Sequence, residues 1–338
     1  MVEYGNCLLS SFNLSEYVLN SFTEHAEFDF KRFKEDIPKV VGFMDDLLEE
    51  GIPYLPLKQH QEQNRNYRQL GIGVLGLADM LIRLGIKYGS DQSLKVVENV
   101  LSLLANESLK ASALLAKERG TYPKYTKDVL KSPYLDAVAN VDTMEYIKKY
   151  GLRNAELLSI APTGSISTLW GVSGGIEPIF ALSHNRKSES LGDGKDVVYQ
   201  VYAQIVRDYM NFKGNVSSNN LPDYFVTSHE ISYKDRVKFQ AVAQKYIDSA
   251  ISSTINLPNS TTIEDIEDLY MMAWEYGLKG VTVYRDGCMR EGILTVNQQN
   301  EEVIENDGEE ICPFCDVKLE FTEGCKKCPE CGFGACSI

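Results

Sequence analysis

The stretch Leu157–Thr168 reads Leu-Leu-Ser-Ile-Ala-Pro-Thr-Gly-Ser-Ile-Ser-Thr and places a small, hydroxyl-rich turn directly after an apolar run. The run Leu157–Ala161 predicts a buried β-strand. The turn supplies backbone N–H groups and Ser/Thr hydroxyls, the donors that hold phosphate where a helix begins. The stretch lacks the Gly-Lys-Ser/Thr of a Walker loop. A tight strand-to-helix turn with a capping Ser explains the same composition, so both interpretations stay open here.

Helix-type and strand-type patterns alternate along the rest of the chain. Apolar residues at every third or fourth position predict helices over Asp29–Glu50, Gln69–Leu84, Leu94–Arg119, Val197–Lys213 and Ile263–Tyr276. Short β-type runs predict strands over Asn6–Asn13, Leu157–Ala161, Ala250–Asn256 and Gly280–Tyr284. This alternation favours parallel pairing, so we expect residues 1–290 to form one α/β sheet or barrel.

Composition narrows the functional classes. The chain has 338 residues, 43% of them hydrophobic, which is typical of a globular protein with a substantial core. Its net charge of −14 argues against a nucleic-acid partner held on a broad basic surface. No apolar run reaches the roughly 20 residues of a membrane span, and no signal peptide is evident, so we expect a cytoplasmic protein without a membrane partner. The four histidines are scattered, which argues against a histidine metal site.

The segment Gly71–Gly76 reads Gly-Ile-Gly-Val-Leu-Gly and has the letters of a dinucleotide-binding fingerprint. The polar residues Asn64–Gln69 before it do not form an apolar strand, so the context that gives this motif its meaning is missing. We therefore reject nucleotide binding here and expect these glycines to allow close packing of a helix.

The C-terminal region has a different composition. Gln298–Glu310 is polar and acidic, and it cannot bury enough apolar surface to fold alone. We interpret residues 291–311 as a flexible linker, with a root-mean-square reach of about 25 Å and an extended limit on the order of 70 Å. Residues 312–338 follow and contain six of the eight cysteines. We expect them to form a small zinc-ribbon-like tail.

Two sets of four tail cysteines have the spacing of a structural zinc site. The first set is Cys312, Cys315, Cys325 and Cys328, which leaves Cys331 and Cys336. The second set is Cys312, Cys315, Cys328 and Cys331, which leaves Cys325 and Cys336. We prefer the first set, because the remaining Cys-x4-Cys pair spans two glycines and can close and reopen a disulfide. A plain zinc ribbon that binds a partner is the alternative for the tail.

Cys7 is the single cysteine among the first 287 residues. A lone cysteine on a β-type segment is usually a small buried apolar residue. By itself, therefore, Cys7 indicates no function.

Taken together, these segments resemble the catalytic chain of ribonucleotide reductases, and more narrowly the adenosylcobalamin-dependent (class II) enzymes. The matching stretches are collinear and extend over the whole chain: Asn6–Leu14, Leu70–Met80, Ala161–Phe180, Asp248–Pro258, Trp274–Gly287 and the cysteine tail. The resemblance implies a ten-stranded α/β barrel in which the ribose 2′-carbon is reduced by radical chemistry, for DNA precursor synthesis.

The resemblance also implies roles for particular residues. Cys7 matches a strand cysteine that helps to reduce the substrate and ends in a disulfide. The turn that holds the substrate phosphates corresponds to Thr163, Gly164, Ser165, Ile166 and Ser167. Cys331 and Cys336 match a tail pair that reduces the active site again by thiol–disulfide exchange, with a thioredoxin or glutaredoxin type of reductant. The implied substrate is a ribonucleoside di- or triphosphate.

Two departures from the family pattern matter. The radical cysteine of the family sits in an Asn-x-Cys-x-Glu loop before the strand that Asn6–Leu14 matches, and that motif is absent here. The chain therefore resembles the second half of the barrel, and we expect an N-terminal reductase polypeptide carrying the radical cysteine to complete a split or truncated enzyme. Without it we expect this ribonucleoside-diphosphate reductase type of chain to be inactive, and most cobalamin contacts to lie in the other half.

The second departure concerns the radical source. Class I subunits have a tyrosine pair on the strand that Val281–Val283 matches, whereas this chain has Thr282 and Val283. The absence of phenols there favours a radical made locally by adenosylcobalamin. The competing hypothesis for the whole chain is a non-catalytic zinc-ribbon binding protein on a nucleotide-binding α/β scaffold.

Overall fold

The structure is a computed structural model that describes residues 3–188, 197–214 and 220–288, and, in the tail, residues 320–322, 325–327, 329–330 and 334–336. The chain divides into two compact units, Met1–Val296 and Asn297–Ile338.

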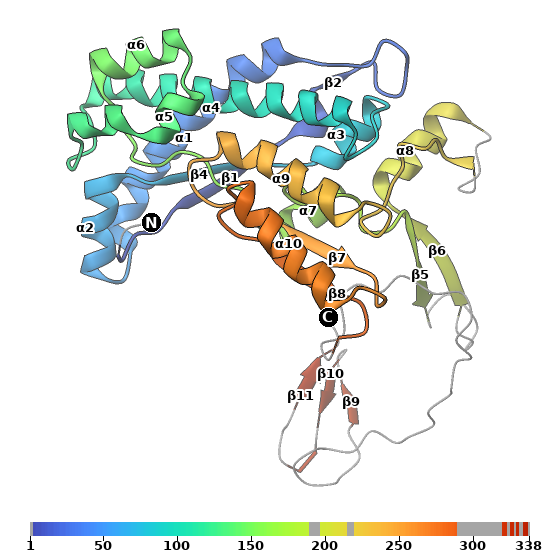
Figure 1. The fold of residues 1–338 in the computed structure, drawn as a ribbon. Coiled ribbons are helices and arrows are strands. Elements are labelled where there is room, and N and C mark those ends of the chain that lie inside the picture. Colours follow the sequence, from blue (N-terminus) through green and yellow to red (C-terminus); the bar gives the residue numbers. More distant parts are fainter. Residues whose placement is uncertain are drawn as a thin grey trace. The chain divides into compact units, whose positions relative to one another are not determined.

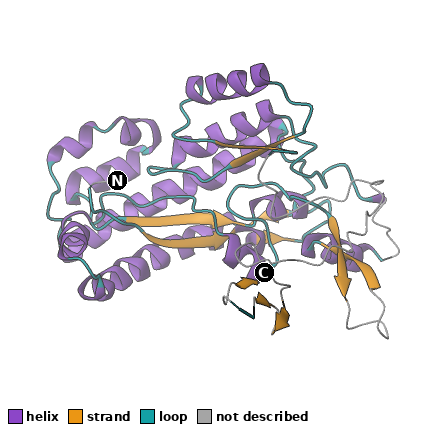
Figure 2. Ribbon diagram, turned by 90° about the horizontal axis from the view of Figure 1, so that it is seen from below, coloured by secondary structure: helices purple, strands orange, loops and turns teal. Residues whose placement is uncertain are grey.

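The centre of the first unit is a row of parallel chain segments. Strand β1 (Leu8–Asn13) pairs in parallel with β4 (Leu70–Leu75), with Leu9 opposite Gly71. Strand β4 continues the row through a parallel bridge from Ile72 to Leu158. Figure 2 shows β1 and β4 lying side by side with helices packed along them.

The row extends beyond the bridge at Leu158. Ile160 makes a parallel bridge to Ile251, and the same chain segment continues into β7 (Thr254–Leu257). Strand β7 pairs in parallel with β8 (Thr282–Arg285). The order is therefore β1, β4, segment 157–160, segment 251–257 and β8, all in the same direction. The predicted α/β class and its parallel pairing are confirmed.

Ten α-helices and three short 3-10 helices surround this row in the described residues. The α-helices are α1 (Phe30–Gly51), α2 (Lys58–Tyr67), α3 (Leu77–Arg83), α4 (Asp91–Arg119), α5 (Pro133–Val138), α6 (Val141–Tyr150), α7 (Gly164–Trp170), α8 (Gln204–Lys213), α9 (Tyr233–Tyr246) and α10 (Ile263–Glu275). The 3-10 helices are η1 (Leu14–Tyr17), η2 (Ile52–Tyr54) and η3 (Lys127–Lys131). Figure 1 shows α1, α4, α5 and α6 gathered on one side of β1 and β4.

The sequence of α1 explains why it forms and how it packs. The Asp29 side chain caps its start by accepting the Arg32 N–H at 2.9 Å. Its buried side chains recur at helical spacing and form one stripe, made of Phe33, Ile37, Val41, Met44 and Leu48. This stripe joins the main hydrophobic core, to which α4, β1 and β4 also contribute.

Two predicted helices are only partly helical. Gln69–Leu84 is strand β4 followed by α3, and Val197–Lys213 is strand β6 (Val197–Tyr202) followed by α8. In the first case the glycines lie inside the strand and alternate with buried Leu70, Ile72 and Val74. Apolar residues therefore recur at every second position, as in a strand. The pattern was not recognised because glycines, rather than polar residues, occupy the positions between them.

Two antiparallel pairs complete the described part of the first unit. Strand β2 (Val18–Leu19) pairs with β3 (Glu27–Phe28), and β5 (Ser183–Ser188) pairs with β6. No helix in the described ranges is long and apolar enough to cross a membrane.

The second unit contains a small antiparallel sheet in the order β9 (Glu320–Thr322), β10 (Cys325–Lys327), β11 (Gly334–Cys336). Its backbone register places Cys325 opposite Cys336. The predicted linker 291–311 lies outside the described residues, as do Cys312, Cys315, Cys328 and Cys331.

Candidate functional site

Three chemically active side chains lie at the amino-terminal edge of the parallel row. Cys7 comes directly before β1, Glu156 directly before segment 157–160, and Asp248 shortly before segment 251–257. The Cys7 thiol donates to Glu156 Oε2, with 3.9 Å between sulfur and oxygen. Because parallel strands bring their starting residues to one edge of a sheet, residues 149 positions apart in the sequence become partners.

The surroundings of Cys7 favour its neutral form. Burial is the largest cause, followed by the negative charges of Glu156 and Asp248, and together they raise the pKa of Cys7 to about 11. At neutral pH the side chain is therefore a thiol. Such a group holds its proton until a reaction removes it.

Asp248 fixes the start of the neighbouring segment. Its two carboxylate oxygens accept the N–H groups of Leu157 and Leu158, each at 2.8 Å. Burial of the carboxyl raises the pKa of Asp248 to about 6, although the two N–H donors oppose the shift. Lys279 donates to the carbonyl oxygens of Asp248 and Ser249, at 2.5 and 2.9 Å.

A buried ionic network holds the chain just before Glu156. Asp45 is fully buried and accepts hydrogen bonds from Arg68 at 2.9 Å and from Asn154 at 3.2 Å through Oδ1. Its Oδ2 accepts from Arg153 at 3.3 Å. Burial raises the pKa of Asp45, but the neighbouring Arg68 and Arg153 charges outweigh it and hold that pKa below its ordinary value. Glu156 follows Asn154 by two residues, so this network also fixes the position of Glu156.

Glycines in β4 bring the neighbouring backbones and side chains close together. A Cβ at Gly71 would lie 2.6 Å from Leu9 Cδ2, 3.3 Å from Cys7 Cβ and 3.4 Å from Ser159 Cβ. A Cβ at Gly73 would collide with the carbonyl oxygen of Ser159. The glycines predicted to pack a helix instead leave room between strands, beside Cys7.

The two faces of the parallel row differ sharply. One face is covered by the core, and its side chains include Phe12, Leu70, Ile72, Val74, Leu158, Ile160, Ile251 and Ile255. Alternation places the other set of side chains on the opposite face, which we call the open face. Its residues are Cys7, Leu9, Ser11, Asn13, Gly71, Gly73, Leu75, Leu157, Ser159, Ser252, Thr254, Asn256, Thr282 and Tyr284. Small and hydroxyl-bearing residues predominate there, and Leu9 is 56% exposed.

The predicted phosphate turn lies at the carboxyl end of segment 157–160, where α7 begins. Thr163 has a left-handed backbone (φ 53°), and its Oγ1 accepts the Gly175 N–H at 2.9 Å. Gly164, Ser165 and Ile166 are exposed, and the N–H groups of a first helical turn have no partner within the helix. Ser167 is buried, and its hydroxyl donates to the Gly164 carbonyl at 3.2 Å.

A second buried ion pair ties the stretch after this turn to β7. Arg236 donates to Glu177 Oε2 at 2.5 Å and to the Ser253 hydroxyl at 2.9 Å. Glu177 Oε1 accepts the Thr254 N–H at 2.6 Å. The phosphate turn and β7 are therefore held in a fixed relation.

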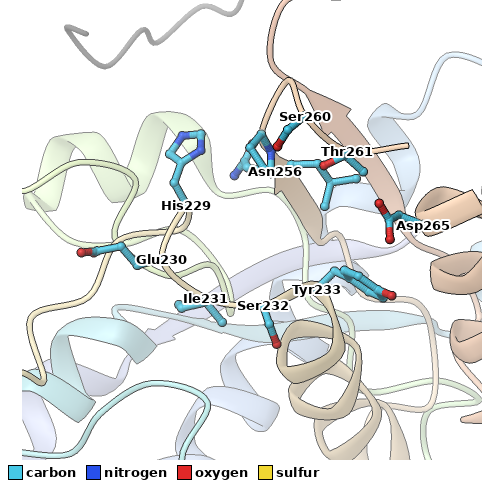
Figure 3. Close-up of a pocket in the computed structure, with 11 residues that line it drawn as sticks. His229, Glu230, Ile231, Ser232, Tyr233, Asn256, Ser260, Thr261 and Asp265 are labelled. Atoms are coloured by element: carbon cyan, nitrogen blue, oxygen red, sulfur yellow. The ribbon is translucent and has the colours of Figure 1, made fainter. Parts of the chain in front are cut away.

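The structure also has a pocket at the carboxyl end of β7 (Figure 3). Its lining comes from residues 229–233, 256–258 and 260–261, and from Asp265. His229 lies in it, with Nδ1 3.6 Å from a carboxylate oxygen of Asp286. None of the predicted site residues lines this pocket.

Sequence reasoning identified Cys7 and the Thr163–Ser167 turn, but it missed Glu156, Asp248 and Arg236. Asp248 stood at the start of a matching stretch, yet nothing in one sequence indicates that it faces Leu157. That relation depends on strand register. Among the described residues no group of three or more His, Cys, Asp or Glu side chains is placed to hold a metal ion, so zinc at the tail cysteines stays a prediction.

These features, five parallel segments with a thiol at one end and a hydroxyl-rich turn at the other, agree with a comparison against protein families. The model for the ribonucleotide reductase barrel domain matches residues 2–284. The chain therefore belongs to the ribonucleotide reductase family.

Its relatives make the relation more specific. The chain is 35% identical over 324 residues to a vitamin B12-dependent ribonucleoside-diphosphate reductase of Thermoplasma acidophilum, a match that covers 90% of this chain and 40% of the relative. An enzyme with the same description from Mycobacterium tuberculosis is 30% identical, with 86% and 41% covered. The chain thus spans about 40% of the length of these relatives, and the predicted resemblance to B12-dependent reductases is confirmed.

A solved structure shows the same architecture. The alpha subunit of the class Id ribonucleotide reductase of Actinobacillus ureae superposes with a TM-score of 0.61 at 25% identity, covering 83% of this chain and 50% of that one. The alternative of a zinc-ribbon binding protein finds no support in these comparisons.

Proposed function

We propose that this chain is the C-terminal half of a ribonucleotide reductase barrel and takes part in the thiol-dependent reduction of ribonucleotides to 2′-deoxyribonucleotides. The observation that carries the proposal is the placement of Cys7 and the Thr163 turn at opposite ends of the parallel row, with β4 between their two segments. The small-residue open face between them leaves space for a nucleotide. The enzyme would be cytoplasmic and would supply DNA precursors.

Each predicted residue has one role in this proposal. The N–H groups of Gly164, Ser165 and Ile166, with the hydroxyl-rich turn from Thr163 to Ser167, hold the phosphates of a ribonucleoside di- or triphosphate. Cys7 supplies a reducing equivalent and ends in a disulfide. Cys331 and Cys336 then reduce that disulfide by exchange, and a thioredoxin or glutaredoxin type of protein reduces the tail.

Adenosylcobalamin is the proposed cofactor, and when bound it supplies the radical. The names of two relatives support it, as does β8, where Thr282 and Val283 cannot be oxidised as tyrosines can. Tyr284 follows them, and its register partner is Asn256 on the open face. Zinc at Cys312, Cys315, Cys325 and Cys328 would fold the tail around a metal rather than a core.

An N-terminal reductase polypeptide is the proposed partner, and it would bring the radical cysteine. In the described residues, β1 pairs with β4 alone and β8 with β7 alone, so both outer strands of the row have an unpaired side. Unpaired strands and uncovered apolar side chains are costly in water. The exposed apolar side chains include Leu9, Leu169, Trp170 and Trp274.

The test is reduction by the complex reconstituted from this chain and an N-terminal reductase portion. Cys7→Ser should abolish multiple-turnover formation of deoxyribonucleotide with a thioredoxin-type reductant. Cys336→Ser should lose multiple turnover but keep one turnover, because the tail acts only after the active site is oxidised. Cys288→Ser, at an exposed cysteine outside these roles, is the matched control. Sustained turnover by Cys7→Ser would disprove the assignment of Cys7.

A further inference from the structure

Two carboxylates lie at the same edge of the row as the Cys7 thiol, and the roles given above use neither of them. Glu156 Oε2 accepts a hydrogen bond from the thiol, with 3.9 Å between sulfur and oxygen. Asp248 precedes the segment beside that of Glu156, and its negative charge also acts on Cys7. On β4, Gly71 lies beside Cys7 and brings no charge.

We propose that Glu156 is the proton acceptor and donor for Cys7 during its redox cycle, an inference that rests on the proposed function. When Cys7 is oxidised, its S–H proton passes to Glu156 Oε2, and its sulfur forms an S–S bond to a second redox cysteine that the N-terminal reductase polypeptide would supply. The two electrons of this dithiol go to the ribose 2′-carbon. The 2′-hydroxyl leaves as water, with one proton from the second thiol and one from the solvent. In the return step a thiolate of the tail dithiol attacks the partner sulfur and the S–S bond breaks. Cys7 leaves with the electron pair and takes its proton back from Glu156.

Geometry selects Glu156 over Asp248 for this role. Both oxygens of Asp248 already accept backbone N–H groups, at 2.8 Å each. Glu156 is only partly buried, so a proton on its carboxyl can exchange with solvent. Lys279 also lies on this edge and donates to the carbonyl oxygens of Asp248 and Ser249.

The carboxylate has a measurable effect on the resting thiol. A negative charge beside a thiol disfavours the thiolate, and each unit of pKa changes the thiolate fraction about tenfold below the pKa. Removing the Glu156 charge should therefore speed reactions of the Cys7 thiolate. It should also slow the turnover step that needs a proton acceptor, on the order of tenfold to a hundredfold.

The experiment compares the full chain with its Glu156→Gln and Glu156→Asp variants. Alkylation by iodoacetamide is followed from pH 7 to pH 10, and peptide mapping by mass spectrometry gives separate rates for Cys7 and Cys288. We expect Glu156→Gln to speed Cys7 alkylation at pH 8 by about threefold to tenfold, to leave Cys288 unchanged, and to slow single-turnover reduction in the reconstituted complex. Glu156→Asp should largely restore both rates. Glu145→Gln, on the exposed side of α6, is the matched control.

The outcomes separate this inference from the proposed function. An unchanged Cys7 alkylation rate in Glu156→Gln would overturn it, as would an unchanged single-turnover rate. A joint acceleration of Cys7 and Cys288 that Glu156→Asp does not reverse would also overturn it, because it would indicate general loosening of the fold. Continued multiple turnover by Cys7→Ser tells against the proposed function instead, whatever the alkylation rates show.

Discussion

Asp248 links the stability of the parallel row to pH at the scale of a single residue. Its folded pKa of about 6 lies above the ordinary 3.8 of an aspartate, so the folded chain binds a proton that the unfolded chain has lost. This contribution is fully favourable below pH 4 and is lost as the pH rises to about 6. The free energy of unfolding should fall by roughly 1.4 kcal/mol per pH unit in that interval from this group alone.

The Asp248→Asn variant isolates the contribution. Asparagine cannot ionise, so the difference in unfolding free energy between wild type and variant should shrink by about 2 to 3 kcal/mol from pH 4 to pH 6.5. Urea denaturation at a series of pH values measures it. Asp128→Asn, which changes an exposed carboxylate, should leave the pH dependence as it is. A constant difference between wild type and Asp248→Asn would show that the carboxyl is not charged differently in the two states.

At the level of single residues, the sequence predicted those that carry their own local pattern. Thr163–Ser167 stood out because strand, turn and helix start are adjacent in the chain. Cys7 gained a role only from family resemblance, since an isolated cysteine has no distinguishing neighbourhood. Glu156 remained hidden because its significance depends on a cysteine 149 positions away, and only parallel pairing brings the two together.

Strand β4 can pack against its neighbours only because glycines occupy its alternate positions. Gly73 lies against the Ser159 carbonyl, and a methyl group there would force the two backbones apart. Gly73→Ala should lower the free energy of unfolding by about 2 to 4 kcal/mol, as other changes that overfill a packed interior do. Thermal or denaturant unfolding of the purified chain provides the measurement.

Gly42 supplies the matched control for that prediction. It lies inside α1, nothing lies within 4 Å of a Cβ added to it, and a methyl group suits a helix interior. Gly42→Ala should stabilise the chain by about 0.5 to 1 kcal/mol. Equal effects of the two substitutions would mean that β4 and segment 157–160 are not closely packed.

Elements with one buried face were well predicted, whereas strand β4 was predicted as part of a helix. Helices α1, α4 and α10 follow their expected ranges within a few residues, because a polar side and an apolar side alternate at helical period. All six residues of strand β4 are buried, and glycines take its alternate positions, so its alternation gave no contrast. The hydrophobic pattern of a segment reports its own solvent exposure, but not what lies on each side of it.

For the whole molecule, the sides of β1 and β8 that are unpaired in the described residues should bind the N-terminal reductase portion. Leu9 is in β1 and more than half exposed, so Leu9→Glu should weaken the association at least about tenfold, by placing an unpaired charge in an apolar contact. Analytical ultracentrifugation of the two purified pieces measures the affinity.

Phe43 offers a comparable substitution elsewhere. It is exposed on α1, which packs on the covered side of the row, so Phe43→Glu should leave the affinity unchanged. A chain that stays monomeric and turns over substrate with no partner would contradict the proposed complex.

The direction of segment 157–160 has a consequence for substrate choice. Thr163, at the start of the phosphate turn, lies seven positions after Glu156, which is beside the thiol. The span is at most about 23 Å at the rise of an extended chain. In the proposed enzyme, this span sets a fixed distance between the turn that binds the phosphates and the thiol that reduces the sugar. A ligand whose sugar sits at another distance from its anchored phosphate would be bound yet left unreduced. The enzyme would then select its substrate by the distance between sugar and phosphate before it selects by base.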